Sequence, residues 1–480
     1  MMKITFSKTL AFGIAASALL IGAVQISSCN GEGGKDQAPM GARELPPPVI
    51  LIVIDTLRAD HLSQYGFEVD TSPALQEFVS QSNRFSHAYS YAPWTRPSMT
   101  TLFTGMHPVR HSVTRRTSLS EEAVTMAEAL GSAGMETVGI SLNPNVSRKT
   151  GLDQGFKVFE EMLGRKTMAY EDVKEMLRLA RMWYYGGPKD SYFLFMLPMN
   201  VHGPYKVPKK RRKDLLGRRP IKGFKYYGKV MKEILKLRMV TEGRAKVTPE
   251  MIQSLHEKYA TAVRYTTDKV GKFFEFLKHE GYYDEAIIIV AGDHGEELFD
   301  HGGFSHGFTL YDELLHVPLI IKLPYQRAGR VIEERVTLAD VFPTVMELTG
   351  QPIPEEVDGK SLAPLLKGEK ERLSDEEETE VFSVAWPKRC VGQAAINWPW
   401  KLIKLESNYE SEEGRTFLFN LELDPGEIKD MSRERPEIVE ELTKSLEKKI
   451  GTYDSGGRYC NNTKLDKQME AQLKALGYMQ

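Results

Sequence analysis

Two acidic motifs stand directly after long apolar runs in this chain. The run Val49–Ile54 (VILIVI) is followed by Asp55, and the run Ala286–Ala291 (AIIIVA) is followed, after one glycine, by Asp293 and His294. Because ligands of open α/β sheets bind at the carboxyl ends of the strands, we expect these side chains to meet at one edge of a sheet. Two carboxylates and an imidazole suit a divalent cation that acts as a Lewis acid. One Asp after a strand would more often be a cap or a turn residue, but two such motifs favour a metal site.

A third candidate for chemistry is Thr95, in the segment APWTRPSM (residues 92–99). Pro97 is typical of the first turn of a helix, so Thr95 should lie at or just before a helix N-terminus. There the helix dipole and the free backbone N–H groups stabilise an anion, either a threonine alkoxide or a bound oxyanion. A threonine that only caps the helix is the alternative interpretation.

The elements that must position these residues are predicted from the apolar pattern. Apolar runs without alternation fit parallel strands that are covered on both faces. Four such runs are Val49–Ile54, Tyr192–Leu197, Ala286–Ala291 and Val317–Lys322. Segments with helical spacing are Ser72–Ser82, Glu121–Ala133 and Tyr259–His279. Strands that alternate with helices predict a layered α/β domain.

The pattern changes after about residue 370. An acidic loop, SDEEETE, is followed by the strand-like runs VFSVAW, AAINW, WKLIKL and TFLFNL. The segment Pro436–Lys449 then has helical spacing. We predict a small antiparallel sheet that is closed by this helix.

Composition excludes several classes of protein. The chain has 480 residues and a formal charge of -2, which argues against a dedicated nucleic-acid binder. Its 41% of hydrophobic residues can form a large core. Three cysteines exclude a disulfide scaffold and a zinc-ribbon array. In an exported chain Cys390 and Cys460 could pair, or they could be two independent buried thiols.

The N-terminus has the pattern of a lipoprotein export signal. An apolar stretch, Leu10–Val24, follows two lysines and is short for a membrane span. The next segment, Ile26–Cys29 (ISSC), resembles the bacterial lipobox, whose cysteine is acylated; an ordinary secretory signal is the alternative. We expect residues 1–28 to be a lipoprotein signal peptide and residues 29–47, rich in Gly and Pro, to be a flexible tether. The protein would then be exported and anchored to a membrane of the bacterial cell envelope, facing the periplasm or the cell surface.

Several motifs occur in a consistent order along the chain: IVIDTLRADHLSQYG, the segment T-x-P-S-x-x-x-LFTG, MxxHGPY and GDHGEE, followed by VDGKSLAPLLKG, WKLIK and LFNLELDPGE. In types and order these motifs resemble the sulfatase family of the alkaline phosphatase superfamily. The resemblance covers roughly residues 48–450 and implies an alkaline-phosphatase-like sandwich: a large mixed, mostly parallel sheet between helices, plus a small C-terminal antiparallel sheet. On this basis residues 48–370 would be the catalytic domain, residues 371–455 the antiparallel subdomain and residues 456–480 a tail.

The resemblance also assigns the metal site and the nucleophile. The family's metal ligands correspond to Asp55, Asp293 and His294, which would hold one divalent ion, Ca²⁺, Mg²⁺, Mn²⁺ or Zn²⁺. The nucleophile corresponds to Thr95. Family members usually have a second acidic or amide ligand after the first Asp, and here that position is Thr56.

Two histidines correspond to residues that contact the reacting group. His202, in HGPY, matches the histidine that contacts the substrate or the leaving group. His306, in FSHGFTLYDE, lies where many members place a Lys or His over the transferred group. His301 and Asn143 are weaker candidates for the site. The alternative for each histidine is a hydrogen-bonded core residue.

The nucleophile motif departs from that of true sulfatases, which read C/S-x-P-x-R and oxidise the Cys or Ser to formylglycine. Here Thr95 takes the nucleophile position and Met99 the arginine position. A threonine cannot be oxidised to that aldehyde, and a sulfated threonine lacks the second hydroxyl that expels sulfate. A phosphorylated threonine is released readily by in-line attack at phosphorus. Thr95 therefore favours phosphoryl chemistry, as in the superfamily's phosphodiesterases and head-group transferases.

Three functions remain open from the sequence. The favoured one is a metal-dependent hydrolase of sulfuric or phosphoric esters, acting on an anionic glycan, lipid head group or small molecule. The alternatives are a phosphoethanolamine- or phosphoglycerol-type transferase of the cell envelope and a non-catalytic family member.

The segment 206–246, directly after the HGPY motif, is strongly basic. It contains sixteen basic and three acidic residues, a net charge of +13. A solvated insertion is the simplest interpretation. The alternative is a surface that gathers an anionic substrate or anionic lipid head groups.

Overall fold

The computed structural model describes residues 45–161, 172–188, 190–205, 207–208, 247–373, 380–386, 390–407, 414–453 and 456–462. The expected signal peptide, Cys29 and all of the tether up to residue 44 lie outside these residues. So do nearly all of the basic segment 206–246 and residues 463–480. Among the helices of the described ranges, none has the length and apolar content that crossing a bilayer requires.

The core of the molecule is a mixed sheet of eight strands in the order β11-β2-β10-β7-β1-β6-β4-β5. Seven strands run in the same direction, and β10 alone is antiparallel to both of its neighbours. The strands are β1 (Val49–Ile54), β2 (Asn83–Tyr89), β4 (Glu136–Ser141), β5 (Val158–Glu161), β6 (Tyr192–Leu197), β7 (Ile287–Gly292), β10 (His316–Lys322) and β11 (Arg330–Thr337). The predicted large, mostly parallel sheet is confirmed.

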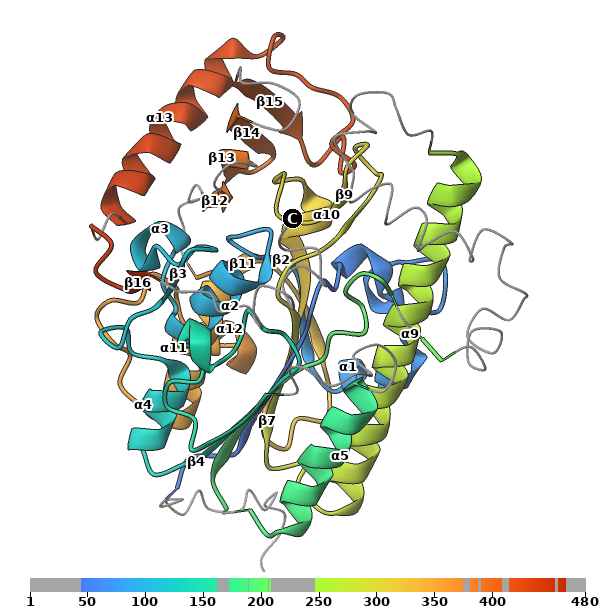
Figure 1. Ribbon diagram of the computed structural model, residues 1–480, viewed down its shortest axis with the longest axis vertical. Helices are drawn as coiled ribbons and strands as arrows, with labels where there is room; N and C mark the ends of the chain where they lie inside the picture. Colours follow the sequence, from blue (N-terminus) through green and yellow to red (C-terminus); the bar gives the residue numbers. More distant parts are fainter. Residues whose placement is uncertain are drawn as a thin grey trace, which may run out of the picture. The chain divides into compact units, whose positions relative to one another are not determined.

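Helices cover both faces of this sheet (Figure 1). On one side lie α5 (Asp172–Tyr185) and α9 (Pro249–His279). On the other side lie α2 (Thr95–Thr104), α4 (Met126–Ser132), α11 (Val341–Thr349) and α12 (Ala363–Lys367).

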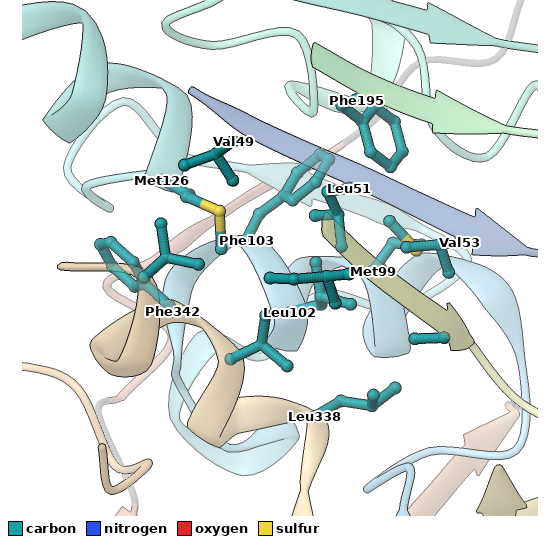
Figure 2. Packing of buried hydrophobic residues seen from close by; sticks show 14 of the residues in the cluster. Val49, Leu51, Val53, Met99, Leu102, Phe103, Met126, Phe195, Leu338 and Phe342 are labelled. Atoms are coloured by element: carbon teal, nitrogen blue, oxygen red, sulfur yellow. The ribbon is translucent and has the colours of Figure 1, made fainter. Parts of the chain in front are cut away.

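The packing of the central strand β1 explains why it contains no polar residue. Ile50, Ile52 and Ile54 pack on the side of α5 and α9. The alternate residues of β1 pack on the side of α2 and α11, as Figure 2 shows for Val49, Leu51 and Val53. All six residues are buried, because each face of the strand meets a helical layer.

Shorter elements connect the layers. They are α1 (Gln76–Ser80), α3 (Pro108–His111), α10 (Asp312–Leu315), β3 (Thr117–Leu119), β8 (Glu297–Leu298), β9 (Phe304–Ser305), β16 (Cys460–Asn462), and the 3₁₀ turns Ala59–His61, Ser63–Tyr65, Pro73–Leu75, Arg148–Thr150 and Leu338–Asp340. Cys460 is a half-buried free thiol. The side chain of Cys390, its possible disulfide partner, is not among those that the structure describes.

The direction of one strand was predicted wrongly. The apolar run that forms β10 fits a parallel strand, but β10 runs antiparallel between β2 and β7. Residues 317–322 of β10 are buried. An apolar run therefore indicates that a strand is buried on both faces, but burial alone does not determine whether the strand is parallel or antiparallel to its neighbours.

The predicted helices differ from the observed ones mainly in their starts. The predicted helix Glu121–Ala133 begins only at Met126, because Thr125 and Glu128 form a capping box. The predicted helix Tyr259–His279 is the C-terminal part of α9, which starts ten residues earlier after the cap Thr248. In place of Ser72–Ser82 there is a 3₁₀ turn followed by α1.

The C-terminal part forms the predicted small antiparallel sheet, with β12 (Glu380–Trp386), β13 (Cys390–Asn397), β14 (Trp400–Ser407) and β15 (Arg415–Asn420) side by side in chain order. Helix α13 (Pro436–Tyr453) packs on one face, where Leu442 meets Leu402 and Leu418. The opposite face packs against α10, where Ile403 and Phe419 share a cluster with Leu315.

A buried ion network joins β14 of the C-terminal sheet to α10. Lys401 of β14 is fully buried, and its Nζ lies 2.6 Å from Asp312 Oδ1 and 2.8 Å from Glu427 Oε1. Removing one partner of a buried network leaves the other charges buried without compensation, which typically lowers the free energy of unfolding by about 3 kcal/mol or more. We expect Lys401→Met to lower the free energy of unfolding by about that amount in urea titrations. Lys444→Met, which removes an exposed pair with Glu440, is the control and should leave stability unchanged. Equal effects of the two variants would show that the network does not stabilise the fold.

Candidate active site

Asp55, Asp293 and His294 converge at the carboxyl ends of two paired strands. Ile54 of β1 pairs with Gly292 of β7, so the residue that follows each strand lies at the same edge of the sheet. One ligand atom from each of the three side chains lies within 4.8 Å of the other two, and all three residues are fully buried. Gly292 is required here, because a Cβ would lie 2.4 Å from the carbonyl oxygen of Leu57.

Hydrogen bonds aim the ligand atoms inward. Asp293 Oδ1 accepts from the backbone N–H groups of Thr56 and His294, both at 2.9 Å, while Asp293 Oδ2 has no hydrogen-bond partner. Asp55 Oδ1 is also buried without a partner. His294 Nδ1 donates to the carbonyl of Gly295 at 2.8 Å, which leaves Nε2 as the acceptor that faces the carboxylates. This is the arrangement in which a neutral histidine binds a metal.

The electrostatics of the cluster fit a cation. Burial raises the pKa of Asp55 to about 6, and burial together with the charge of Asp55 raises the pKa of Asp293 well above its usual range. Burial lowers the pKa of His294, so the ring is neutral. Two buried carboxylates can both ionise only when positive charge lies between them. The donor set and its unpartnered oxygens therefore fit one divalent cation.

Thr56 does not replace the second ligand that the family carries. Its Oγ1 donates to the carbonyl of Asp55 at 2.8 Å, and its contribution to the site is its backbone N–H. Its own carbonyl accepts from the Tyr259 hydroxyl at 2.5 Å, which anchors this turn to α9.

Thr95 is the first residue of α2, in agreement with its expected place at a helix N-terminus. Its hydroxyl lies 3.2 Å from His294 Nε2 and so points at the cluster of Asp55, Asp293 and His294. Ser98, one turn further along, donates to the carbonyl of Asp293 at 2.5 Å and fixes α2 against the end of β7. The positive end of the helix dipole thus adds to the field at the Thr95 oxygen.

Asn143, a weaker candidate from the sequence, lies inside the site. Its Nδ2 donates to Asp55 Oδ2 and, at 3.3 Å, to Thr95 Oγ1. Its Oδ1 accepts from the backbone N–H of Asn145 at 2.8 Å, which fixes the orientation of the amide. Asn143 therefore presents a hydrogen-bond donor to the site. Asparagine after a strand is common in turns, so its position in the sequence is only a weak signal for a functional role.

His202 and His306 lie next to the cluster. The His306 ring centroid is 4.6 Å from that of His294 and 5.0 Å from that of His202. His202 Nδ1 donates to the carbonyl of Gly203 at 2.7 Å, and His306 Nδ1 lies 3.3 Å from Glu296 Oε1. Burial raises the pKa of Glu296 to about 7, against the opposing effect of His202. Glu296 follows the metal motif directly, and only the geometry shows that it holds His306.

Met99, at the arginine position of the sulfatase motif, points away from this chemistry. It is fully buried in the apolar layer between α2 and the sheet, near Val53 and Leu102 (Figure 2).

His301, the other weaker candidate, has a different role. Its Nδ1 lies 2.7 Å from Glu313 Oε1 and its Nε2 3.1 Å from the carbonyl of Glu427, so both ring nitrogens are engaged. Burial opposes the charge on this ring, but the hydrogen bond and charge of Glu313 prevail and raise the pKa of His301 to about 9.

This shift makes the stability contributed by His301 depend on pH. The folded pKa lies above the unfolded value of about 6.5, so the contribution is complete below about pH 6.5 and is lost as the pH rises through about 9. We expect His301→Gln to destabilise the protein near pH 6, and the difference from wild type in urea unfolding should shrink above pH 9. A difference that stays constant with pH would contradict the assigned ion pair. His279→Gln, at an exposed histidine, is the control.

The family is shown by comparison with known proteins. The sulfatase family model matches residues 47–351, and the model of the C-terminal region of N-sulphoglucosamine sulphohydrolase matches residues 299–454. The chain therefore belongs to the sulfatase family, with an alkaline-phosphatase-like fold, and it is an ester hydrolase of that superfamily.

Individual relatives include both sulfur and phosphorus enzymes. A Δ4,5-hexuronate-2-O-sulfatase of Bacteroides thetaiotaomicron is 25% identical over 79% of this chain and 84% of that protein. A phosphonate monoester hydrolase from Silicibacter pomeroyi superposes with a TM-score of 0.68 at 20% identity, covering 88% of this chain and 100% of the other. A structure solved in complex with its substrate D-glucosamine-2-N,6-O-disulfate superposes with a TM-score of 0.67 at 17% identity, covering 85% and 98%.

Proposed function

We propose that this protein hydrolyses phosphoric or phosphonic esters of an anionic substrate, with Thr95 as the nucleophile. One observation carries the proposal: the Thr95 hydroxyl, at a helix N-terminus, lies 3.2 Å from His294 Nε2 within the buried metal-type cluster. A threonine supplies a single oxygen, so a phosphoryl or sulfuryl group bound to it can be removed only by attack at the phosphorus or sulfur atom. Attack at phosphorus allows this exit.

The metal would be held by Asp55, Asp293 and His294. When bound, the ion would lower the pKa of the Thr95 hydroxyl and neutralise charge on the ester. The candidates remain Ca²⁺, Mg²⁺, Mn²⁺ and Zn²⁺.

The residues of the chain then divide the work in two steps. In the first, ionised Thr95 Oγ1 bonds to phosphorus, the bond to the leaving alkoxide breaks, and a protonated histidine, His202 or His306, gives that oxygen a proton. In the second, the same histidine removes a proton from water, the water oxygen bonds to phosphorus, and the bond to Thr95 breaks. The Asn143 N–H donates to the Thr95 oxygen in the resting state and is in place to stabilise it when it is released.

Sulfuric ester hydrolysis is the second candidate function. The Bacteroides relative is a sulfatase by name, and a structural neighbour was solved with a sulfated glucosamine as its substrate. A sulfate ester of a glycan would react at the same cluster of Asp55, Asp293 and His294, beside Thr95.

A paired assay separates the two candidates. Purified protein loaded with each of the four ions is tested on an aryl phosphodiester, an aryl phosphonate and an aryl sulfate that share one leaving group. We expect kcat/KM to be highest for the phosphorus esters, and faster turnover of the sulfate would overturn the assignment. Transfer of the phosphoryl group to added glycerol or ethanolamine, at the expense of hydrolysis, would favour the transferase instead. Absence of turnover with every ester, in protein that binds metal, would favour the non-catalytic alternative.

We also propose that the enzyme acts while tethered to a membrane through acylated Cys29. The lipobox-like ISSC segment supports this proposal. Labelling of cells with a radioactive fatty acid should mark the wild-type protein and leave Cys29→Ala unlabelled. Equal labelling of both would refute the tether.

A further inference from the structure

Arg96, the residue after Thr95, is a fully buried cation. Its Nη1 donates to the backbone carbonyls of Thr114, Arg115 and Thr117, each at 3.1 Å. Its Nη2 donates to Asn145 Oδ1, also at 3.1 Å. These four oxygens surround the two terminal nitrogens and offset much of the cost of burying the guanidinium. Lysine could not reach both the three carbonyls and Asn145, because its donors radiate from a single atom.

The bond to Asn145 leads back to the active site. Asn145 is almost fully buried and uses its side chain to accept from Arg96, while its backbone N–H donates to Asn143 Oδ1 at 2.8 Å. The other end of the same amide, Asn143 Nδ2, donates to Asp55 Oδ2 and to Thr95 Oγ1. A continuous path of buried hydrogen bonds therefore starts at Arg96 and returns to the residue beside it.

We propose that Arg96 is a positioning residue, which fixes the loop 143–145 against α2 and so aims the Asn143 N–H at the Thr95 oxygen. The inference rests on the proposed role of Thr95 as nucleophile. Because Thr95 and Arg96 are adjacent on one helix, the helix carries both the reacting oxygen and the group that orients its hydrogen-bond donor. A donor held in place in a site without bulk water stabilises a charged oxygen much more strongly than a mobile one does.

A double-mutant cycle tests the proposal. Arg96→Met keeps a long unbranched side chain and removes the donors; we expect kcat per bound metal to fall by about 10–100-fold, as for other residues that orient a site, with little change in KM. Asn143→Ala should cause a loss at least as large. In the Asn143→Ala background, Arg96→Met should cost little more, because the group that it orients is gone. The same fractional loss in both backgrounds would overturn the proposal.

Two further variants protect the test from general destabilisation. Arg110→Met removes a structural arginine that pairs with Asp358, so any loss of rate that it causes should be the same with and without Asn143. Asn145→Ala removes the acceptor of Arg96 and keeps the backbone N–H, so it should reproduce the loss caused by Arg96→Met, including its dependence on Asn143. If Asn145→Ala has wild-type rates, the path through Asn145 is wrong.

A measurement without substrate separates this inference from the proposed function. The Asn145 amide proton is held by Asn143 Oδ1, so hydrogen exchange at that amide should accelerate in Arg96→Met while exchange in β1 and β7 is unchanged. If exchange at Asn145 accelerates in Arg96→Met but Thr95→Ala has wild-type activity, the hydrogen-bond path is supported and the assignment of Thr95 as nucleophile is wrong. Unchanged exchange at Asn145 would reject the path itself.

Discussion

Replacement of Thr95 by alanine is expected to reduce kcat by roughly 10³-fold or more, the scale seen when an enzyme loses its nucleophile. The hydroxyl of Thr95 lies 3.2 Å from His294 Nε2 and accepts from Asn143, so its removal takes away the oxygen at which the reaction would occur. Metal content, measured by elemental analysis, should stay unchanged, because the three ligand side chains remain. Mass spectrometry of rapidly quenched wild-type enzyme should find phosphate on the peptide that contains Thr95.

Two matched variants make this result specific. Thr95→Ser retains the hydroxyl and should keep a measurable part of the activity. Thr104→Ala removes another buried hydroxyl from α2, one that donates to the carbonyl of Thr100 at 2.7 Å, and should have much smaller effects. Wild-type rates for Thr95→Ala would show that the nucleophile is another group.

Replacement of Asp293 by asparagine is expected to weaken metal binding by more than about 100-fold and to abolish activity in parallel. The substitution preserves shape and one acceptor oxygen, so the backbone N–H groups of Thr56 and His294 can still be satisfied. What it removes is a negative charge from a fully buried cluster, and that charge attracts the cation. Metal affinity is measured by calorimetry and activity over a titration of each ion.

The control is Asp284→Asn, at a partly exposed aspartate that lies before the start of β7 and pairs with Arg327. It should change neither metal affinity nor rate. Full activity in excess chelator, or an Asp293→Asn variant that binds metal normally, would contradict the metal site.

The sequence predicts the centre of the fold better than its edges. β1 and β6 were predicted residue for residue, because strands covered on both faces carry unbroken apolar runs. β11 was missed, since this edge strand mixes exposed and buried residues (RVIEERVT) and pairs only with β2. β4 was missed because polar Glu136 and Thr137 and the glycine at 139 interrupt its apolar residues.

The candidate site divides in the same way. Ligands that follow strands directly, such as Asp55 and Asp293, can be read from the chain, and the structure brings them together with Thr95. The supporting contacts of Asn143, Ser98 and Glu296 could not be predicted. Each contact depends on where a loop or helix lies in space relative to a strand that is distant in sequence. Local sequence patterns do not determine that relative position.

The pairing of Ile54 with Gly292 has an evolutionary consequence. Ile, Val and Leu can replace one another in these two strands at modest cost, since volume and apolar character persist. Insertion or deletion of one residue in either strand is different: it displaces the following aspartate by about 3.3 Å and moves the side chains beyond the change to the opposite faces of the sheet. The two strands should therefore drift freely in composition while their lengths stay constant, and a homologue with an altered strand length should have lost its metal even where both aspartates remain.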